Sequence, residues 1–269
     1  MREFLTIDCA GDPIAATLDT GDESAPAGLL IVGGGTEIRA GAHGGMAQLA
    51  AAVAAAGWPV LRYDRRGVGD SGGEDPGFAD SGPDITAAAD ALRARLGPGG
   101  RVVGFGLCDG ATALALHHAP AKLDALLLAN PWVVEPAGDL PPPAAVRAHY
   151  LARLTDGAFW KRLLTGGVDL RKAARGVASL GAVADDNLPT RIASALGAGR
   201  RPLAILLAKG DGTAIAFDDA WAGRAFANVR DGVEVVRIDS PSHTFAADDA
   251  AMLAAFVVAG MERFATDAP

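Results

Sequence analysis

Short apolar runs rich in β-branched residues recur along the chain, and stretches with helical spacing separate them. The alternation predicts a mostly parallel sheet covered by helices on both faces. The first two runs are joined by a Gly-Asp-Pro turn and predict an antiparallel hairpin ahead of the parallel strands. The eight predicted strands are Glu3 to Asp8, Ala15 to Asp19, Gly28 to Val32, Pro59 to Asp64, Arg101 to Leu107, Leu123 to Ala129, Pro202 to Ala208 and Val233 to Ile238.

Alanine and leucine recur at helical spacing between these strands, so each intervening segment has one apolar face to place against the sheet. The predicted helices lie near His43 to Ala56, Pro83 to Leu96, Asp109 to His118, Phe217 to Ala227 and Asp248 to Phe264. The expected fold class is therefore α/β, with an eight-stranded sheet.

The interval of residues 131–201 breaks this rhythm. It is much longer than an ordinary crossover loop and opens with the proline-rich stretch EPAGDLPPPAAV. Helical patterns follow around His149 to Leu164 and Leu170 to Leu180. We expect an inserted helical cap at 131–201, with residues 1–130 and 202–269 forming the core.

Composition and charge narrow the possible partners. Half of the residues are apolar, yet the run from Met252 to Val258 is far short of the roughly 20 residues that span a bilayer. The first residues do not resemble a secretory signal, so a cytoplasmic location is expected, where Cys9 and Cys108 would stay reduced. A formal net charge of −8 without a basic stripe argues against nucleic acid as a partner.

The stretch GFGLCDG at residues 104–110 has the spacing of a nucleophile elbow, Gly-x-Ser-x-Gly, with cysteine in place of serine. The glycines are needed because a strand turns into a helix so tightly that a Cβ at either flank would clash. Here Gly106 and Gly110 flank Cys108 between a buried strand and a predicted helix. The pattern predicts a cysteine nucleophile; the alternative is a small buried hydrophobe in a scaffold without activity.

Two further residues follow in the order that a catalytic triad requires. Asp211 comes directly after the seventh strand and His243 after the eighth, so all three candidates stand at carboxyl ends of strands. The backbone N–H of Asp109, with that of Gly34 or Gly35 after the third strand, would form the oxyanion hole. Asp211 could instead be a turn or helix-cap residue.

These segments together resemble the α/β-hydrolase superfamily over nearly the whole chain. The matching motifs are GLLIVGGG, RYDRRGVGDSGG at 62–73, GFGLCDG, KGDGTAIAF at 209–217 and SHTF at 242–245. Dienelactone hydrolases in this superfamily share the Gly-x-Cys-x-Gly elbow, which implies that cysteine is a competent nucleophile in the fold.

A narrower resemblance is to the exosortase A system-associated hydrolase 1 family, which carries Arg-x-Gly-x-His and Leu-Cys-Asp motifs. The matching residues are Arg39, Gly41 and His43 in the first motif and residues 107–109 in the second. The resemblance implies a bacterial hydrolase linked to exopolysaccharide and protein-sorting gene clusters. Arg39 and His43 are candidate substrate contacts, although Arg39 could pair with Glu37 and His43 could begin a helix.

Cysteine chemistry limits the substrate. A thiolate that adds to an alkyl ester is itself expelled more readily than the alkoxide, whereas thioesters, aryl esters and enol lactones escape this bias. We expect hydrolysis of an activated small-molecule acyl compound, such as a carrier-bound thioester, with His243 as base then acid. Transfer to an amine or alcohol is one alternative, and a noncatalytic binding protein on the same scaffold is the other.

An acyl pocket would need apolar walls over the elbow. The aromatic candidates are Trp132 at the start of the predicted cap and Tyr150 and Trp160 within it, each of which could instead belong to the cap's own core. No histidine pair has metal-ligand spacing, so neither a metal nor another cofactor is expected. The sequence leaves the oligomeric state open.

Overall fold

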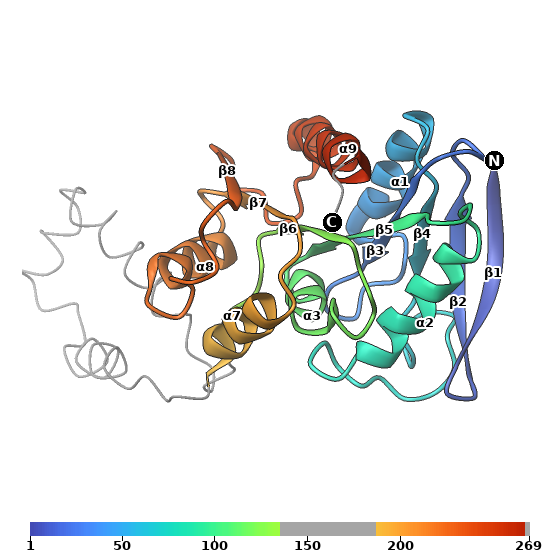
Figure 1. The fold of residues 1–269 in the computed structure, drawn as a ribbon, viewed down its shortest axis with the longest axis horizontal. Coiled ribbons are helices and arrows are strands. Elements are labelled where there is room, and N and C mark those ends of the chain that lie inside the picture. The colour runs from blue at the N-terminus through green and yellow to red at the C-terminus, as the bar shows by residue number, and fades with distance from the viewer. Residues whose placement is uncertain (135–186, 267–269) are drawn as a thin grey trace, which may run out of the picture.

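The computed structural model describes residues 1–134 and 187–266 and has an α/β architecture built on one eight-stranded sheet (Figure 1). The strand order is β1-β2-β4-β3-β5-β6-β7-β8. The hairpin β1 and β2 is antiparallel and joins β4 antiparallel, while all pairs from β4 to β8 are parallel. The expected sheet is confirmed. The strands are β1 (Arg2–Cys9), β2 (Asp12–Asp19), β3 (Ala27–Val32), β4 (Val60–Tyr63), β5 (Arg101–Leu107), β6 (Ala125–Ala129), β7 (Leu203–Ala208) and β8 (Glu234–Ile238).

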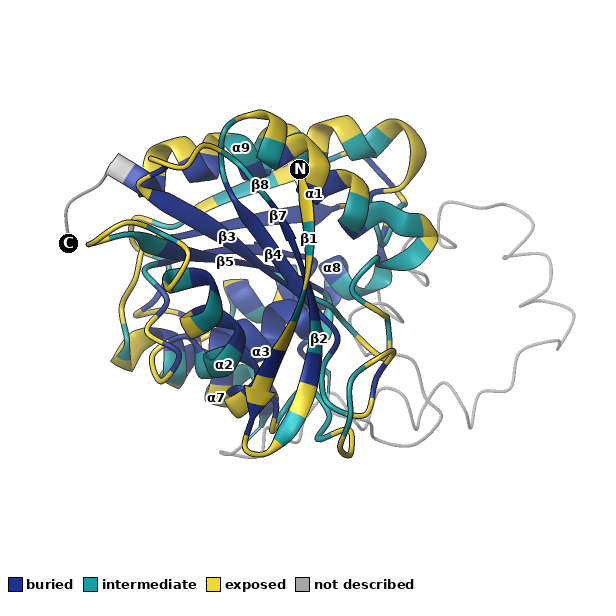
Figure 2. Ribbon diagram, turned by 90° about the vertical axis from the view of Figure 1, so that its right-hand side faces the viewer, coloured by how far each residue is buried: buried dark blue, intermediate teal, exposed yellow. Residues whose placement is uncertain are grey.

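Helices cover both faces of the sheet, as Figure 2 shows around the dark-blue buried strands. One apolar cluster packs α1 (Gly45–Ala55) and α9 (Ala250–Thr266) against one face. A second cluster covers the other face with α2 (Gly82–Arg93), α3 (Asp109–His117), α7 (Leu188–Ala198) and α8 (Gly212–Ala222). Because the central strands are buried on both sides, they are continuous apolar runs rather than alternating ones.

Helix α8 begins five residues before the predicted position near Phe217. The Asp211 side chain accepts a hydrogen bond from the Ala214 N–H at 3.0 Å and so caps the helix directly after the β7 turn. The predicted boundary near Phe217 was therefore wrong. The Asp211 cap starts the helix at Gly212, and the apolar periodicity alone did not indicate this first turn.

Helix α7 was not predicted. Its side chains Leu188, Ile192 and Leu196 are buried in the cluster that also contains α3, so this described end of the predicted cap packs as a helix of the core layer. The helical segments around 149–164 and 170–180 lie outside the described residues. The cap itself stays a prediction.

Three arginine–aspartate pairs hold β4 and the loop that follows it. Arg62 binds Asp19 at 2.9 Å, and Arg66 binds Asp84 at 3.0 Å. Both carboxylates are almost completely shielded from solvent, where an unpaired charge would be costly. Arg65 completes this loop with bonds to Asp75 and the Gly35 carbonyl oxygen (2.8 Å). The RYDRRGVGDSGG stretch thus holds loops in place at the carboxyl edge of the sheet.

Candidate active site

The elbow at Cys108 has the expected strand–turn–helix geometry. Cys108 follows β5 and precedes α3, with φ 57° and ψ −126°, a left-handed conformation that costs energy for a residue other than glycine. A Cβ on Gly106 would lie 2.6 Å from the Ala111 nitrogen, and one on Gly110 would lie 2.5 Å from the Val32 carbonyl oxygen. Both glycines are therefore required by the close approach of backbone to backbone.

Neighbouring strand ends hold the elbow from the other side. The Cys108 N–H donates to the Ala129 carbonyl oxygen at 3.0 Å, and the Cys108 carbonyl accepts from the Trp132 N–H at 3.1 Å. The Thr112 hydroxyl also donates to the Trp132 carbonyl at 2.5 Å. The backbone of Trp132 thus lies beside Cys108, and its side chain is partly buried against the core; a contact of Trp132 with substrate stays a prediction.

The imidazole of His243 links the predicted acid and the predicted nucleophile. Its Nδ1 lies 3.0 Å from Oδ2 of Asp211, and the Cys108 side chain also acts on the ring. The bond to Asp211, followed by the influence of the Cys108 side chain, raises the pKa of His243 to about 10 against the opposing effect of burial. The structure brings these three residues together from strands β5, β7 and β8.

Local sequence explains how the acid and the base are placed. Asp211 is buried, and the same oxygen that caps α8 also faces His243. The His243 loop is shaped by its own serines: the Ser242 N–H donates to the Ser240 hydroxyl at 2.9 Å, and the Ala246 N–H donates to the Ser242 hydroxyl at 3.0 Å. Both loops are therefore fixed by hydrogen bonds rather than by packing alone.

The glycine loop after β3 approaches the elbow, but its N–H groups differ in availability. The Gly35 N–H donates to the Asp109 carboxylate at 2.5 Å. A Cβ on Gly34 would lie 2.7 Å from the Asp109 carboxylate, 2.8 Å from the Leu107 carbonyl oxygen and 3.5 Å from the Cβ of Cys108, so the backbone of Gly34 lies against the elbow. The Asp109 N–H is in the first turn of α3, where helical N–H groups have no intrahelical acceptor. The N–H groups of Asp109 and Gly34 are therefore the candidate oxyanion-hole donors, because the Gly35 N–H already donates to the Asp109 carboxylate.

Arg39 holds its loop rather than pointing a free guanidinium at a substrate. The guanidinium binds Asp64, which is fully buried, and also contacts Asp70 at 2.9 Å and the Thr17 hydroxyl at 3.1 Å. The alternative partner considered for Arg39, Glu37, instead accepts from the Ala42 N–H at 3.1 Å. A contact of Arg39 with substrate stays a prediction.

Of the three remaining residues predicted to contact substrate, the structure describes His43 alone. His43 is exposed in the 3-10 turn η1 (Ala42–Gly44) with φ 52°. The helix α1 begins at Gly45, two residues after the predicted start at His43. Tyr150 and Trp160 lie outside the described residues. A contact of His43 with substrate stays a prediction.

One residue that sequence reasoning missed is Asn130, directly after β6. It is fully buried, and its amide bridges to the His243 carbonyl oxygen and the Ala208 N–H. The only signal in the sequence was an asparagine before a proline at a strand end, a pattern that also marks ordinary turns.

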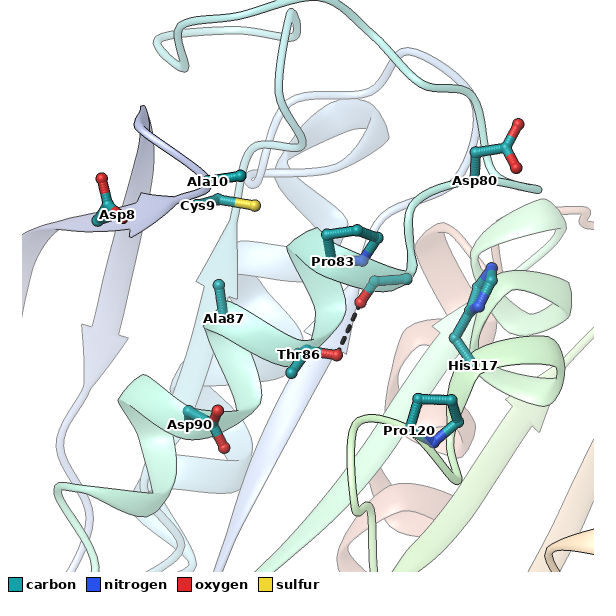
Figure 3. A pocket seen from close by; sticks show the side chains of 11 residues that line it. Asp8, Cys9, Ala10, Asp80, Pro83, Thr86, Ala87, Asp90, His117 and Pro120 are labelled. Carbon is teal, nitrogen blue, oxygen red and sulfur yellow. Dashed lines mark hydrogen bonds between the residues drawn. The ribbon is translucent and has the colours of Figure 1, made fainter.

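A hollow of about 700 Å³ lies away from the triad, between the β1–β2 turn, the start of α2 and the end of α3 (Figure 3). Cys9 and His117 both line it. Burial, followed by the nearby Asp84 carboxylate, raises the pKa of the Cys9 thiol, and Nε2 of His117 is 2.8 Å from the Ala79 carbonyl oxygen. This second cysteine therefore lacks the surroundings that activate a thiol.

Two kinds of site were also searched among the described residues. No group of three or more His, Cys, Asp or Glu side chains is arranged there to hold a metal ion. No described helix has both the length and the apolar character needed to cross a bilayer.

Comparison with known proteins gives one family match and many structural matches. The model of a family described as "Serine aminopeptidase, S33" matches residues 28–197, more than half of the chain. No curated protein matches the chain.

Three solved structures illustrate the fold. An esterase from Pyrococcus furiosus has 16% identity and a TM-score of 0.67, with 98% of this chain and 91% of that chain covered. A Xanthomonas campestris α/β serine hydrolase described as having no lid has 17% identity and a TM-score of 0.61, covering 100% and 97%. A thioesterase domain from the curacin biosynthetic pathway has 16% identity and a TM-score of 0.60, covering 96% and 99%. At such identities the likeness shows the fold.

Proposed function

The chain belongs to the serine aminopeptidase S33 family within the α/β-hydrolase superfamily, and from this premise we propose that it is a cysteine hydrolase of activated acyl compounds. The observation that carries the proposal is the position of His243, whose ring is hydrogen-bonded to the Asp211 carboxylate at 3.0 Å and whose pKa is raised by Asp211 and by the Cys108 side chain. The family description names a serine aminopeptidase, whereas the elbow residue in this chain is the cysteine Cys108.

The first half-reaction forms a thioacyl-enzyme. The Cys108 thiolate attacks the acyl carbon, a carbon–sulfur bond forms, and the carbonyl electron pair moves onto oxygen. The N–H groups of Asp109 and Gly34 stabilise this oxyanion. When the tetrahedral intermediate collapses, the bond to the leaving group breaks and His243 donates its Nε2 proton to that group.

In this proposal His243 acts first as an acid and then as a base, whereas the sequence led us to expect the reverse order. With its pKa raised to about 10, His243 is an imidazolium at neutral pH, so it enters the proposed cycle as an acid. The neutral imidazole left after acylation then accepts a proton from water, and the resulting hydroxide attacks the thioester. Collapse of the second intermediate releases the acid and restores the thiolate–imidazolium pair, which Asp211 orients.

Thioesters are the preferred substrate class in this proposal. Their leaving thiolate and the Cys108 thiolate are expelled with comparable ease, so the first intermediate does not return mainly to substrate. An alkyl oxyester has no such balance and depends fully on proton donation by His243. The structurally similar thioesterase domain supports this class only through its fold. A carrier-bound thioester and a cytoplasmic location remain parts of the proposal, as does the narrower exosortase-associated assignment.

Intact-mass spectrometry tests the proposal directly. The protein is incubated with matched acyl thioesters, aryl esters and alkyl esters of the same acyl chain, and the adduct is mapped by peptide sequencing. We expect an acyl adduct on Cys108 with the first two, which decays to free acid, and turnover of the thioester about tenfold or more above the alkyl ester. The Cys108→Ala variant should form no adduct.

A matched variant separates nucleophile chemistry from binding. Cys108→Ser keeps the elbow and should narrow or reverse the preference for thioesters over alkyl esters, since an alkoxide nucleophile has no leaving-group bias against oxyesters. Equal turnover of thioester and alkyl ester by the wild-type protein would contradict the proposed substrate class. Faster loss of the adduct on adding an amine or alcohol would instead identify an acyltransferase.

A further inference from the structure

Asn130 occupies the junction between the three loops that carry the triad. It follows β6 directly, its side chain is fully buried, and its backbone has φ 40°. Asparagine tolerates this left-handed region better than most residues because its short polar side chain can bond locally. The position therefore demands both an unusual backbone conformation and a satisfied buried amide.

The amide is bonded to two different strand ends. Its Nδ2 donates to the His243 carbonyl oxygen at 2.9 Å, and its Oδ1 accepts from the Ala208 N–H at 2.9 Å. The backbone N–H of Asn130 also donates to the Leu206 carbonyl oxygen at 3.0 Å. One side chain thus ties the loop after β8 to the end of β7.

Short backbone connections extend this link to the other two triad residues. The Ala208 carbonyl accepts from the Asp211 N–H at 3.0 Å, so the residue held by Asn130 also starts the Asp211 turn. Ala129, the residue before Asn130, accepts from the Cys108 N–H at 3.0 Å. Asn130 is therefore within two hydrogen bonds of all three loops.

The other bonds that shape the His243 loop are the local ones made by Ser240 and Ser242 and a 2.8 Å bond from the Gly210 N–H to the Ser240 carbonyl oxygen, which ties the loop to the Asp211 turn. They set the curvature of the loop but do not attach the backbone of His243 to β6. The Asn130 amide makes that attachment in a buried site, where loss of a hydrogen-bond partner is expensive.

We propose that Asn130 is a positioning residue that fixes the His243 imidazole between the Cys108 thiol and the Asp211 carboxylate. The proposal rests on the function proposed above and adds a residue to it. A displacement of the imidazole by about 1 Å is enough to slow a reaction about a hundredfold, so a residue that makes no contact with substrate can control the rate.

Two variants separate the amide from the backbone conformation. Asn130→Asp keeps the shape and the acceptor for the Ala208 N–H but places an oxygen opposite the His243 carbonyl oxygen. Asn130→Gly accepts φ 40° without strain and removes both side-chain bonds. Asn187→Ala is the matched control, because the Asn187 side chain caps α7 with a 3.0 Å bond to the Thr190 N–H at a site in a different part of the fold.

Three measurements are made on folded protein, as checked by circular dichroism. The first is the rate of Cys108 alkylation by iodoacetamide at neutral pH, mapped by mass spectrometry to distinguish it from buried Cys9. The second is the NMR titration of the His243 ring. The third is the exchange of the wild-type Asn130 side-chain amide protons with solvent, which does not depend on any variant folding.

The Asn130 variants should slow Cys108 alkylation about tenfold or more, and the His243 titration should move down toward the ordinary histidine range near pH 6.5. Asn187→Ala should lower the melting temperature and change neither readout, and the Asn130 amide protons should exchange slowly. Unchanged alkylation and titration in both Asn130 variants, or fast exchange of the amide protons, would overturn the role of Asn130 alone.

His243→Ala distinguishes this failure from failure of the proposed function. If that variant slows alkylation while the Asn130 variants do not, the triad stands and the positioning role is wrong. If His243→Ala leaves alkylation at the wild-type rate, the triad itself is wrong and the role of Asn130 falls with it.

Discussion

Replacing Gly110 with alanine tests whether the elbow depends on close contact between α3 and the end of β3. The added Cβ would lie 2.5 Å from the Val32 carbonyl oxygen and 2.8 Å from that of Gly33, whereas ordinary contacts begin at 3.4 Å. The helix must therefore move by about 3.4 − 2.5 = 0.9 Å, and both obstacles are backbone atoms in a buried strand end. Overpacking of this kind costs about 3 kcal/mol.

Gly197→Ala is the matched control with the opposite expected sign. Gly197 is exposed in α7, and the nearest atom to its added Cβ is Cγ2 of Val229 at 4.0 Å. The substitution should stabilise the helix by about 0.5 to 1 kcal/mol, because alanine loses less backbone entropy than glycine.

Thermal unfolding followed by circular dichroism measures both changes. At about 2 to 4 °C per kcal/mol for a chain of this size, Gly110→Ala should lower the melting temperature by about 6 to 12 °C, and Gly197→Ala should raise it by about 1 to 4 °C. A melting temperature of Gly110→Ala equal to that of the wild type would refute the steric reasoning, and so would a loss as large in Gly197→Ala.

Three other predictions concern charged groups. Arg66→Ala leaves the fully buried Asp84 carboxylate without its ion pair and should lower the free energy of unfolding by about 3 to 5 kcal/mol in urea titrations; adding Asp84→Asn should recover part of the loss, and no recovery would argue against an unpaired charge as the cause. The folded pKa of His243 lies above its ordinary value of 6.5, so its stabilisation is complete below about pH 6.5 and is lost as the pH rises toward 10; the difference in unfolding free energy between wild type and His243→Gln should shrink over that window, and a constant difference would contradict the raised pKa. Asp109→Ala removes the carboxylate that accepts the Gly35 N–H and should destabilise the protein by about 1 kcal/mol, with Asp109→Asn losing less; identical chemical-denaturation midpoints for all three proteins would show that this bond contributes nothing.

The sheet and the order of the triad could be predicted from the sequence because both depend on local signals. Buried strands need continuous apolar runs, and an elbow needs Gly106 and Gly110 around its nucleophile. The carboxyl ends of parallel strands meet at one edge of the sheet, so placing Asp211 and His243 after successive strands was enough to expect their approach. The structure places both within hydrogen-bonding range of each other.

Contacts between segments distant in sequence could not be predicted. Nothing near Arg39 indicates that Asp64 and Asp70 engage its guanidinium. Similarly, a glycine run predicts a backbone that approaches a ligand, but it does not reveal that the Asp109 carboxylate already takes the Gly35 N–H. The start of α8 was misplaced because apolar periodicity alone did not register the Asp211 cap, which begins the helix at Gly212.

The non-glycine residues Cys108, Asn130 and Phe245, which lie at or next to Cys108 and His243, have positive φ angles. Each conformation is unfavourable by itself and persists because surrounding hydrogen bonds and packing enforce it. On warming, the backbone at these three positions should relax before the β-sheet melts, since local opening needs less free energy than global unfolding. A heated sample would then retain its full helical and strand signal after the geometry around Cys108 and His243 has already been lost.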